Sequence, residues 1–268
     1  MTREPGALTG SSRRRERTRP EFSVIVPTLD EEARLDETLR RAKSALGPEV
    51  EVIVVDGGSR DRTTAIAAHH GRILSARRNR GAQLATGARA ATGGVLVFLH
   101  ADTWLPDGGA TAIRTAVRAG AEAGCFRFAL DPNARSWRYR LLEWGVNWRT
   151  RRFRTATGDQ ALFATRDAYE ACGGFRDLPL FEDVTFVRAV RRVARFRLLP
   201  LAVHTSSRRW EAGFLRTVVR HWALRAAFLA GADPRRLRRY HERPAGITES
   251  GVPPSQCARQ TSDSRPRR

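Results

Sequence analysis

Two apolar runs of strand length each end in an aspartate. Asp56 closes the run 51–56, and Asp102 closes the run 95–102 just after His100. Uninterrupted apolar runs are typical of strands buried on both faces of a parallel sheet, so both aspartates should lie at the carboxyl edge of that sheet. Carboxylates there can accept hydrogen bonds from a base or ribose and can hold the cation that neutralises a diphosphate. The pattern predicts a nucleotide site, although Asp56 alone also suits a turn and Asp102 alone suits a cap of the next segment.

The elements that would position these aspartates alternate between strands and helices. Strands are predicted at 22–27, 51–56 and 72–75 before the run 95–102, and each is followed by a helix-forming segment. The acidic cluster 30–32 is expected to open the first of these helices. Short connections between parallel strands imply right-handed crossovers. We therefore expect an α/β fold, with a doubly wound, mainly parallel sheet and helices on both faces, in a single domain.

The composition indicates which classes of partner the protein can bind. A formal charge of +20 over 268 residues indicates an anionic partner, and the arginine-rich segments 1–20 and 233–268 are expected to be disordered basic tails. Arginine together with tryptophan also suits a module that binds nucleic acid, which is an alternative hypothesis. The sequence has three cysteines without metal-ligand spacing, and we find neither a secretory leader nor a stretch of ~18 apolar residues. We therefore expect a cytoplasmic protein, and peripheral attachment to the inner face of the cell membrane is left open.

An ordered set of motifs extends over residues 22–232. The motifs are Pro27 with Asp30-Glu31, the segment 54–63, Leu99-His100-Ala101-Asp102, Gly158-Asp159-Gln160, Gly173-Gly174-Phe175, and Leu180-Phe181-Glu182-Asp183. This set resembles the family-2 glycosyltransferases of the GT-A fold, and the resemblance implies a nucleotide-binding half at 21–104 and an acceptor half at 105–232. Within the family the sequence is similar to a small bacterial branch without a transmembrane domain, whose members are often labelled as glucosyltransferases acting on a carotenoid acid, 4,4'-diaponeurosporenoate.

The resemblance implies a donor site that contains a divalent cation. Asp102 would bind manganese or magnesium that bridges the diphosphate, while His100 replaces the first acid of the Asp-x-Asp signature of the family. A neutral imidazole can ligate manganese, so His100 is either a second metal ligand or a polar residue at a strand end. Asp56 would bind the base. The residues implied to bind the nucleotide sugar are Pro27, Glu31, Asp56, Gly57, Arg80, Gly81, Asp102 and Arg209.

The resemblance also implies a catalytic pair, Glu182 and Asp183. In an inverting transfer, a carboxylate within hydrogen-bond reach removes the proton from the acceptor hydroxyl, and Asp183 suits this role while Glu182 orients it or binds the acceptor. The structural alternative for Asp183 is a carboxylate that favours the N-terminus of the predicted helix 184–193.

Two stripes of large apolar residues at helical spacing follow in the acceptor half. They suit either a buried core or an interfacial helix and apolar acceptor groove, because tryptophan beside arginine favours an anionic membrane surface. The first stripe consists of Trp137, Leu141, Trp144 and Trp148, and the second of Phe214, Leu215, Val218, Val219, Trp222, Ala226 and Leu229.

These features favour an inverting, metal-dependent transfer from a nucleoside-diphosphate sugar, expected to be UDP-linked, to a lipid-like acceptor at a membrane surface. No specific nucleic acid is expected as a partner. A nucleotidyltransferase needs similar acids and a metal and is the closer alternative, which would release pyrophosphate instead of UDP.

Overall fold

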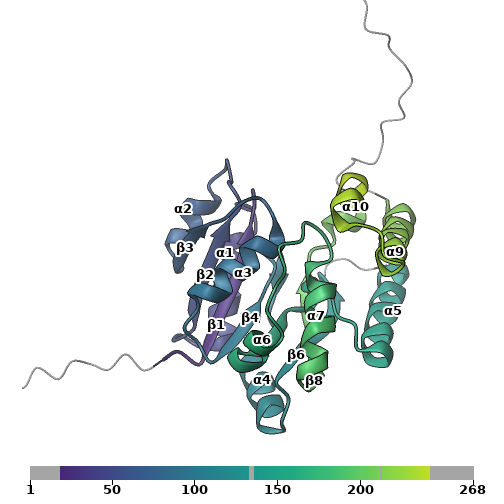
Figure 1. Ribbon diagram of the computed structural model, residues 1–268. Coiled ribbons are helices and arrows are strands. Elements are labelled where there is room, and N and C mark those ends of the chain that lie inside the picture. The colour runs from purple at the N-terminus through teal and green to yellow at the C-terminus, as the bar shows by residue number, and fades with distance from the viewer. Residues whose placement is uncertain (1–18, 133–135, 212, 242–268) are drawn as a thin grey trace, which may run out of the picture.

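The computed structural model describes residues 19–132, 136–211 and 213–241, and its strands form one mixed sheet (Figure 1). The strands are β1 (Phe22–Thr28), β2 (Glu51–Asp56), β3 (Arg72–Ser75), β4 (Val95–Phe98), β5 (Thr103–Trp104), β6 (Ala123–Leu130), β7 (Leu162–Thr165) and β8 (Phe196–Thr205). The helices are α1 (Leu35–Leu46), α2 (Thr63–Ala68), α3 (Arg80–Ala90), α4 (Gly109–Arg118), α5 (Trp137–Phe153), α6 (Arg166–Ala171), α7 (Glu182–Val193), α8 (Arg208–Glu211), α9 (Phe214–Leu229) and α10 (Pro234–His241), with a 3-10 turn η1 (Gly158–Gln160).

The strand order is β3-β2-β1-β4-β7-β6-β8-β5. Strands β1 to β4 are parallel to one another, and β6 is parallel to β8. Strand β7 runs antiparallel between β4 and β6, and β5 runs antiparallel to β8. The prediction of a mainly parallel α/β sheet is confirmed, and the reversed β7 joins the two halves of the chain into one sheet.

Alternation along the central strands divides the core between the two faces of the sheet. Val24, Val54 and Val97 face one side, where they pack with apolar residues of α1 and α4. Ile25 and Phe98 face the other side, where they pack with residues of α3, α6 and α7. The helices therefore cover both faces, as a doubly wound sheet requires.

Strand β4 and helix α1 begin or end at other residues than predicted. Strand β4 stops at Phe98 because the chain turns at residues 100–103 to enter β5. Helix α1 begins at Leu35 and not in the acidic cluster, since the amides of Asp30, Glu31 and Glu32 donate instead to side chains of the loop 59–63.

The prediction of an unstructured tail from residue 233 is wrong for residues 234–241, which form α10. Asp233 accepts a hydrogen bond from the Arg235 amide at 2.9 Å, as an N-terminal cap does, and Leu237 is buried. The predicted tails 1–18 and 242–268 lie outside the described residues.

Helices α5, α9 and α10 form a layer at one side of the molecule, separate from the helices that cover the sheet (Figure 1). The Asn147 side chain on α5 exchanges two hydrogen bonds of 2.8 Å with the Phe128 backbone of β6, and Tyr139 packs edge-on against Phe214 of α9. Among the described helices, none combines the length and the apolar character that crossing a bilayer requires.

Candidate active site

The carboxyl edge of β1, β2 and β4 gathers several of the predicted donor-site residues. His100 and Asp102 are half-buried in the turn after β4. Burial, and then the charge of Asp102, raise the pKa of the Glu31 carboxyl, which lies in the turn after β1. Arg208 from α8 forms an ion pair with Glu31 at 3.6 Å. Two carboxylates and an arginine therefore meet where the sequence places a diphosphate.

Asp56 occupies the end of β2, where its carboxylate is 6% exposed and already bonded. Oδ2 accepts hydrogen bonds from the amides of Gly58 at 2.8 Å and Ser59 at 3.0 Å, and Oδ1 accepts one from the Ser59 hydroxyl. These contacts are those of the turn aspartate that the sequence allowed. Its contact with a base stays a prediction.

Pro27, Gly57 and Gly81 of the predicted donor site lie where the backbone is closely packed or hydrogen-bonded. Pro27 is buried inside β1, and the Gly57 amide donates to the Thr28 carbonyl at 2.9 Å. Gly81 begins α3, where a Cβ would collide with the Arg176 carbonyl oxygen, so the close approach of these segments requires glycine. The structure gives a packing reason for both glycines, and a role in nucleotide binding stays a prediction.

Glu182 and Asp183 lie in the first turn of α7, in different environments. Glu182 is 2% exposed, and its Oε1 lies 3.5 Å from Nη1 of Arg80. Asp183 is half-buried and lines the cavity, where Oδ2 accepts a hydrogen bond from the Gly158 amide at 2.7 Å and Oδ1 accepts one from the Val184 amide at 2.6 Å. Each carboxylate oxygen has two lone pairs, so both retain one for a ligand.

The charges around Arg80 are coupled. Burial raises the pKa of Glu182 to about 7, with the Asp183 carboxylate adding to this rise and Arg80 opposing it. Burial lowers the pKa of Arg80, but the carboxylates of Glu182, Asp183 and Asp102 outweigh it and raise that pKa overall. Arg80 thus lies within the field of Asp102 and of the predicted catalytic pair.

Gly158 connects the two ends of this site. Its amide donates to Asp183, and a Cβ at this position would collide with the imidazole of His100. The backbone before α7 is also constrained, because Phe181 has a φ of 62° and stacks on Phe228 of α9 at 4.7 Å. The pair at the start of α7 is therefore held from the η1 side and from α9.

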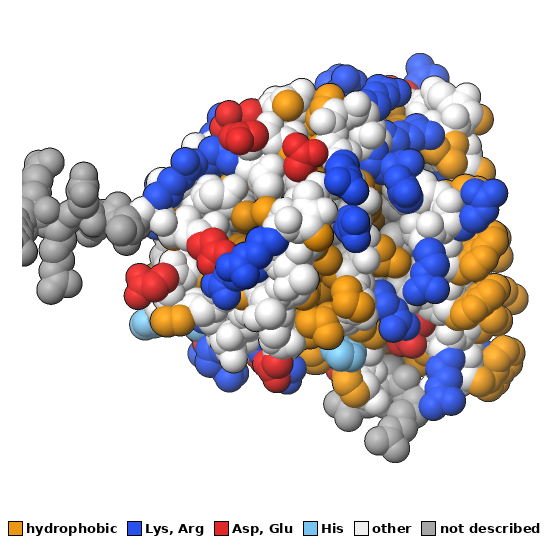
Figure 2. All heavy atoms as spheres, turned by 90° about the horizontal axis from the view of Figure 1, so that it is seen from below, with side chains coloured by type: hydrophobic (Ala, Val, Ile, Leu, Met, Phe, Trp, Pro, Cys, Tyr) orange, Lys and Arg blue, Asp and Glu red, His pale blue; other side chains and the backbone are white. Residues whose placement is uncertain are grey.

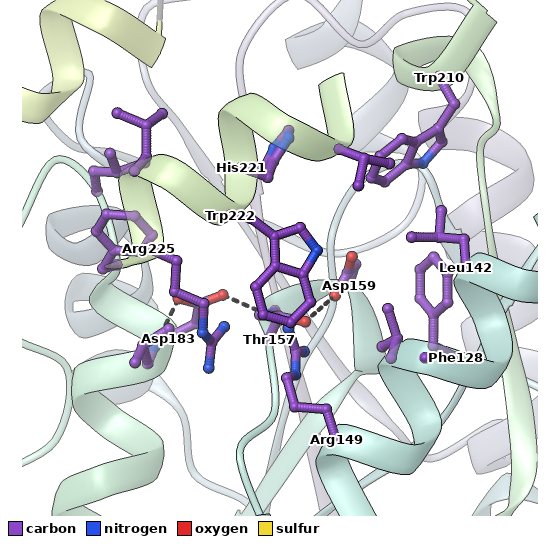
Figure 3. Close-up of a pocket in the computed structure, with 18 of the residues that line it drawn as sticks. Phe128, Leu142, Arg149, Thr157, Asp159, Asp183, Trp210, His221, Trp222 and Arg225 are labelled. Carbon is purple, nitrogen blue, oxygen red and sulfur yellow. Dashed lines mark hydrogen bonds between the residues drawn. The ribbon is translucent and has the colours of Figure 1, made fainter. Parts of the chain in front are cut away.

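A cavity of about 400 Å³ lies between α5, α9 and the start of α7 (Figure 3). Arg80, His100, Glu182 and Asp183 line one part of it, so two of the predicted donor-site residues share one space with the predicted catalytic pair. Apolar side chains line much of the rest: Phe128, Leu141, Leu142, Val146, Leu180, Phe181, Phe214, Leu215, Val218, Trp222 and Leu224.

Two arginines that line this cavity, Arg149 and Arg225, were not among the predicted site residues. A signal for Arg225 exists in the sequence, since it follows Trp222 by three residues and precedes Leu229 by four, on the apolar stripe itself. The side chain of Arg209, which was predicted to bind the diphosphate, lies outside the described part of the chain, whereas its neighbour Arg208 makes the ion pair with Glu31.

The two apolar stripes are not core. Trp137, Leu141, Trp144 and Trp148 on α5 are between 51% and 70% exposed, and we call them, with Phe153, the aromatic surface. Figure 2 shows hydrophobic and arginine side chains side by side along this edge of the molecule. Leu141, Leu215 and Trp222 are exposed and also line the cavity, so the cavity opens beside the aromatic surface.

The fit of a divalent cation rests on Asp102 and His100. Within residues 19–132, 136–211 and 213–241, no group of three or more His, Cys, Asp and Glu side chains is placed to hold a metal alone. One carboxylate and one imidazole in the same turn match instead a cation that takes its other ligands from phosphate and water, as magnesium does in nucleotide sites. The residues present fit manganese or magnesium bound together with a diphosphate.

Comparison with known proteins places this chain in a family. Residues 23–180 match the family model described as "Glycosyl transferase family 2", and the chain belongs to this family. None of the curated proteins matches the sequence.

Solved structures share the fold at low sequence identity. A mannosyltransferase from Pyrobaculum calidifontis, solved with GDP-Man and Mn²⁺, is 20% identical with a TM-score of 0.58, over 81% of this chain and 66% of that one. TarS 1-349 from S. aureus is 19% identical with a TM-score of 0.57, over 73% of this chain and 63% of that one. The same enzyme solved with UDP-GlcNAc is 17% identical with a TM-score of 0.55, over 69% and 58%. The chain therefore spans at most about two thirds of these structures, and the expected GT-A fold is confirmed.

Proposed function

We propose that this protein is an inverting hexosyltransferase that moves a sugar from a nucleoside-diphosphate donor, UDP-linked in our proposal, to a lipid-like acceptor. A carotenoid acid is one member of that acceptor class. The observation that carries the proposal is a single cavity in which Asp183, Arg80 and His100 face an apolar wall. The similar structures that hold GDP-Man with Mn²⁺ and UDP-GlcNAc support a nucleotide-sugar donor.

The proposed reaction assigns each group one task. The acceptor oxygen forms a bond to the anomeric carbon, and the bond from that carbon to the diphosphate oxygen breaks, with its electron pair leaving on the nucleoside diphosphate. A hydroxyl acceptor gives its proton to Asp183, whose free lone pairs face the cavity. Arg80 and Arg208 stabilise the negative charge on the leaving diphosphate. Glu182 positions Arg80 through the contact at 3.5 Å.

Asp102 and His100 would hold the divalent cation in this proposal. When bound, manganese or magnesium supplies Lewis-acid stabilisation of the departing diphosphate. The protein contributes the carboxylate oxygen of Asp102 and the imidazole of His100, which packs against Gly158.

The proposed donor site is tested by calorimetric titration of the full chain with UDP, with and without manganese. We expect manganese-dependent binding in the wild type and its loss in Asp102→Asn, because that change removes the one carboxylate assigned to the cation. Asp107→Asn is the matched control, since Asp107 is an exposed acid after β5 outside the site.

Binding that survives Asp102→Asn at saturating manganese would contradict the role of Asp102. An absence of UDP binding in the wild type would contradict the proposed donor. Release of pyrophosphate instead of UDP during turnover would favour a nucleotidyltransferase.

We also propose that the aromatic surface rests on the inner face of the cell membrane, at an anionic phospholipid bilayer. Exposed tryptophans on α5 alternate with exposed arginines, among them Arg138, Arg151 and Arg152, which complement anionic headgroups. Because the cavity opens beside this surface, an apolar acceptor would pass from the bilayer to Asp183 without crossing water.

Removal of two stacked tryptophans tests this surface. The ring centroids of Trp144 and Trp148 lie 6.2 Å apart. We expect the double change to glutamine to weaken binding to vesicles of phosphatidylcholine and phosphatidylglycerol at least tenfold, about 1.4 kcal/mol. Co-sedimentation measures the partition. Val193→Gln, at a half-exposed apolar residue of α7, is the control and should bind as the wild type does. Equal binding by the double variant would contradict the proposed orientation.

A further inference from the structure

Two arginines in the cavity have no task in the proposed reaction. Arg149 extends from α5 and Arg225 extends from α9, and Figure 3 shows both guanidinium groups reaching into the space beside Asp183. Arg225 is only 9% exposed, which is rare for an arginine without an ionic partner. Both lie on the helices that carry the apolar stripes.

Neither arginine forms a close ion pair within the described residues, although the carboxylates of Asp159 and Asp183 act on both from farther away. The Nε and Nη2 atoms of Arg149 are buried and have no hydrogen-bond partner. Within the described part of the chain, Arg225 makes neither a hydrogen bond nor a close ion pair with a carboxylate. Burying charged donors without partners is costly, so a fold that keeps two of them facing one space indicates a ligand that pairs with them.

The electrostatics of the pair favour an anion. Burial lowers the pKa of Arg225 to about 10, and the neighbouring charge of Arg149 acts in the same direction. Burial also lowers the pKa of Arg149, against the opposing fields of Asp159 and Asp183. An anionic group between the two guanidinium groups would favour the charged form of both, since burial disfavours that form in each.

The apolar side chains that line the cavity indicate what kind of molecule carries the anionic group. Phe128, Leu142, Val146 and Val218 line the same cavity, and none of them offers a side-chain hydrogen bond. A wholly polar anion would leave this surface uncovered, whereas a neutral lipid would leave both guanidinium groups unpaired. An amphiphile satisfies both requirements.

On the basis of the proposed function, we propose that the acceptor is an anionic amphiphile whose carboxylate or phosphate group binds between Arg149 and Arg225. The guanidinium fork matches the paired oxygens of either group, and its donors are already desolvated in the free protein. The apolar body of the acceptor then lies along α5 and α9 toward the opening beside the aromatic surface. The arginine pair selects charged acceptors against neutral alcohols of the same length.

The test compares decanoate, decyl phosphate and decan-1-ol by calorimetric titration of the full chain below micelle-forming concentrations. We expect the wild type to bind at least one of the two anions ten times or more tightly than the alcohol. Arg149→Gln and Arg225→Gln should each lose most of that preference. Arg216→Gln removes an exposed arginine from α9 and Arg192→Gln removes one from α7, and both variants should retain it. The stronger of the two anions identifies carboxylate or phosphate as the group that is bound.

Three results would overturn the inference. The first is equal wild-type affinity for decan-1-ol and both anions, which needs no variant to be folded. The second is an equal loss in the control variants, which would assign the preference to general positive charge. The third is a loss of UDP affinity in Arg149→Gln and Arg225→Gln with no loss of anion preference, which would assign the pair to the donor.

The amphiphile titration needs no donor, so its result is separate from the donor test. UDP binding without anion preference overturns only the arginine assignment, and anion preference without UDP binding overturns only the proposed donor.

Discussion

Asp183→Asn is expected to lower turnover on a hydroxyl acceptor by about 100- to 10,000-fold, while the affinity for the sugar nucleotide changes less than threefold. The substitution keeps the size of the side chain but removes the base that accepts the hydroxyl proton. The amides of Gly158 and Val184 donate to the two carboxylate oxygens, and asparagine can accept only one of these bonds, so an unchanged affinity for the sugar nucleotide serves as the sign that the start of α7 has not shifted. The rate of UDP release and a titration with UDP measure the two quantities.

The control for this prediction is Asp167→Asn. Asp167 is an exposed acid in the first turn of α6, so it interacts with a helix N-terminus as Asp183 does but lies outside the cavity. If both variants lose the same small amount of activity, Asp183 favours only its helix and is not the base. If the acceptor oxygen belongs to an ionised acid, there is no proton to remove, and the loss in Asp183→Asn should fall below tenfold on that acceptor.

Glu182→Gln is expected to stabilise the protein at pH 8 by about 3 kcal/mol relative to the wild type. Burial raises the pKa of Glu182 from 4.5 to about 7, so between these pH values the folded state binds more protons at this group than the unfolded state does. The free energy of unfolding therefore falls as the pH rises from 4.5 to 7 in the wild type. Glutamine cannot ionise, and the variant loses this dependence.

Urea denaturation at pH 4.5, 6 and 8 measures the difference between the two proteins. The gain should be near zero at pH 4.5 and should grow to its full value above pH 7. Glu49→Gln, at an exposed position between α1 and β2, should show no such trend. A difference that is constant with pH would contradict the buried, protonated state of Glu182. The same variant should also lower turnover, because Arg80 loses the group that positions it.

The donor half of the fold could be predicted from the sequence because each of its strands is marked by a short segment of the chain. Each of its longer strands is an unbroken apolar run, and the polar residues His100 and Asp102 come directly after one of them. The reversed strands were not predicted, since β5 has two residues and β7 has four, too few for a periodic pattern. Their place in the sheet depends on partners far away in the chain.

In the acceptor half, the sequence pattern does not distinguish a buried helix from an exposed one. A stripe of tryptophan and leucine at helical spacing is the same in a core and at a surface, and Trp144 is exposed because no element of the described part of the chain covers it. The pairing of Arg149 with Arg225 depends likewise on how α5 and α9 approach one another. Arg80 was expected at the diphosphate, but its contact with Glu182 comes from a long-range approach of α3 and α7.

Gly158 contacts residues at both ends of the proposed reaction, Asp183 and His100. Its nitrogen holds the proposed base, and its α-carbon leaves room for the imidazole of His100 on the leaving-group side. In a displacement that proceeds in line, a misplacement of about 1 Å between the attacking and departing atoms can cost about 100-fold in rate. Because groups at both ends of the proposed reaction contact one main-chain unit, any side chain larger than hydrogen at position 158 would push His100 away and change the spacing of the two ends.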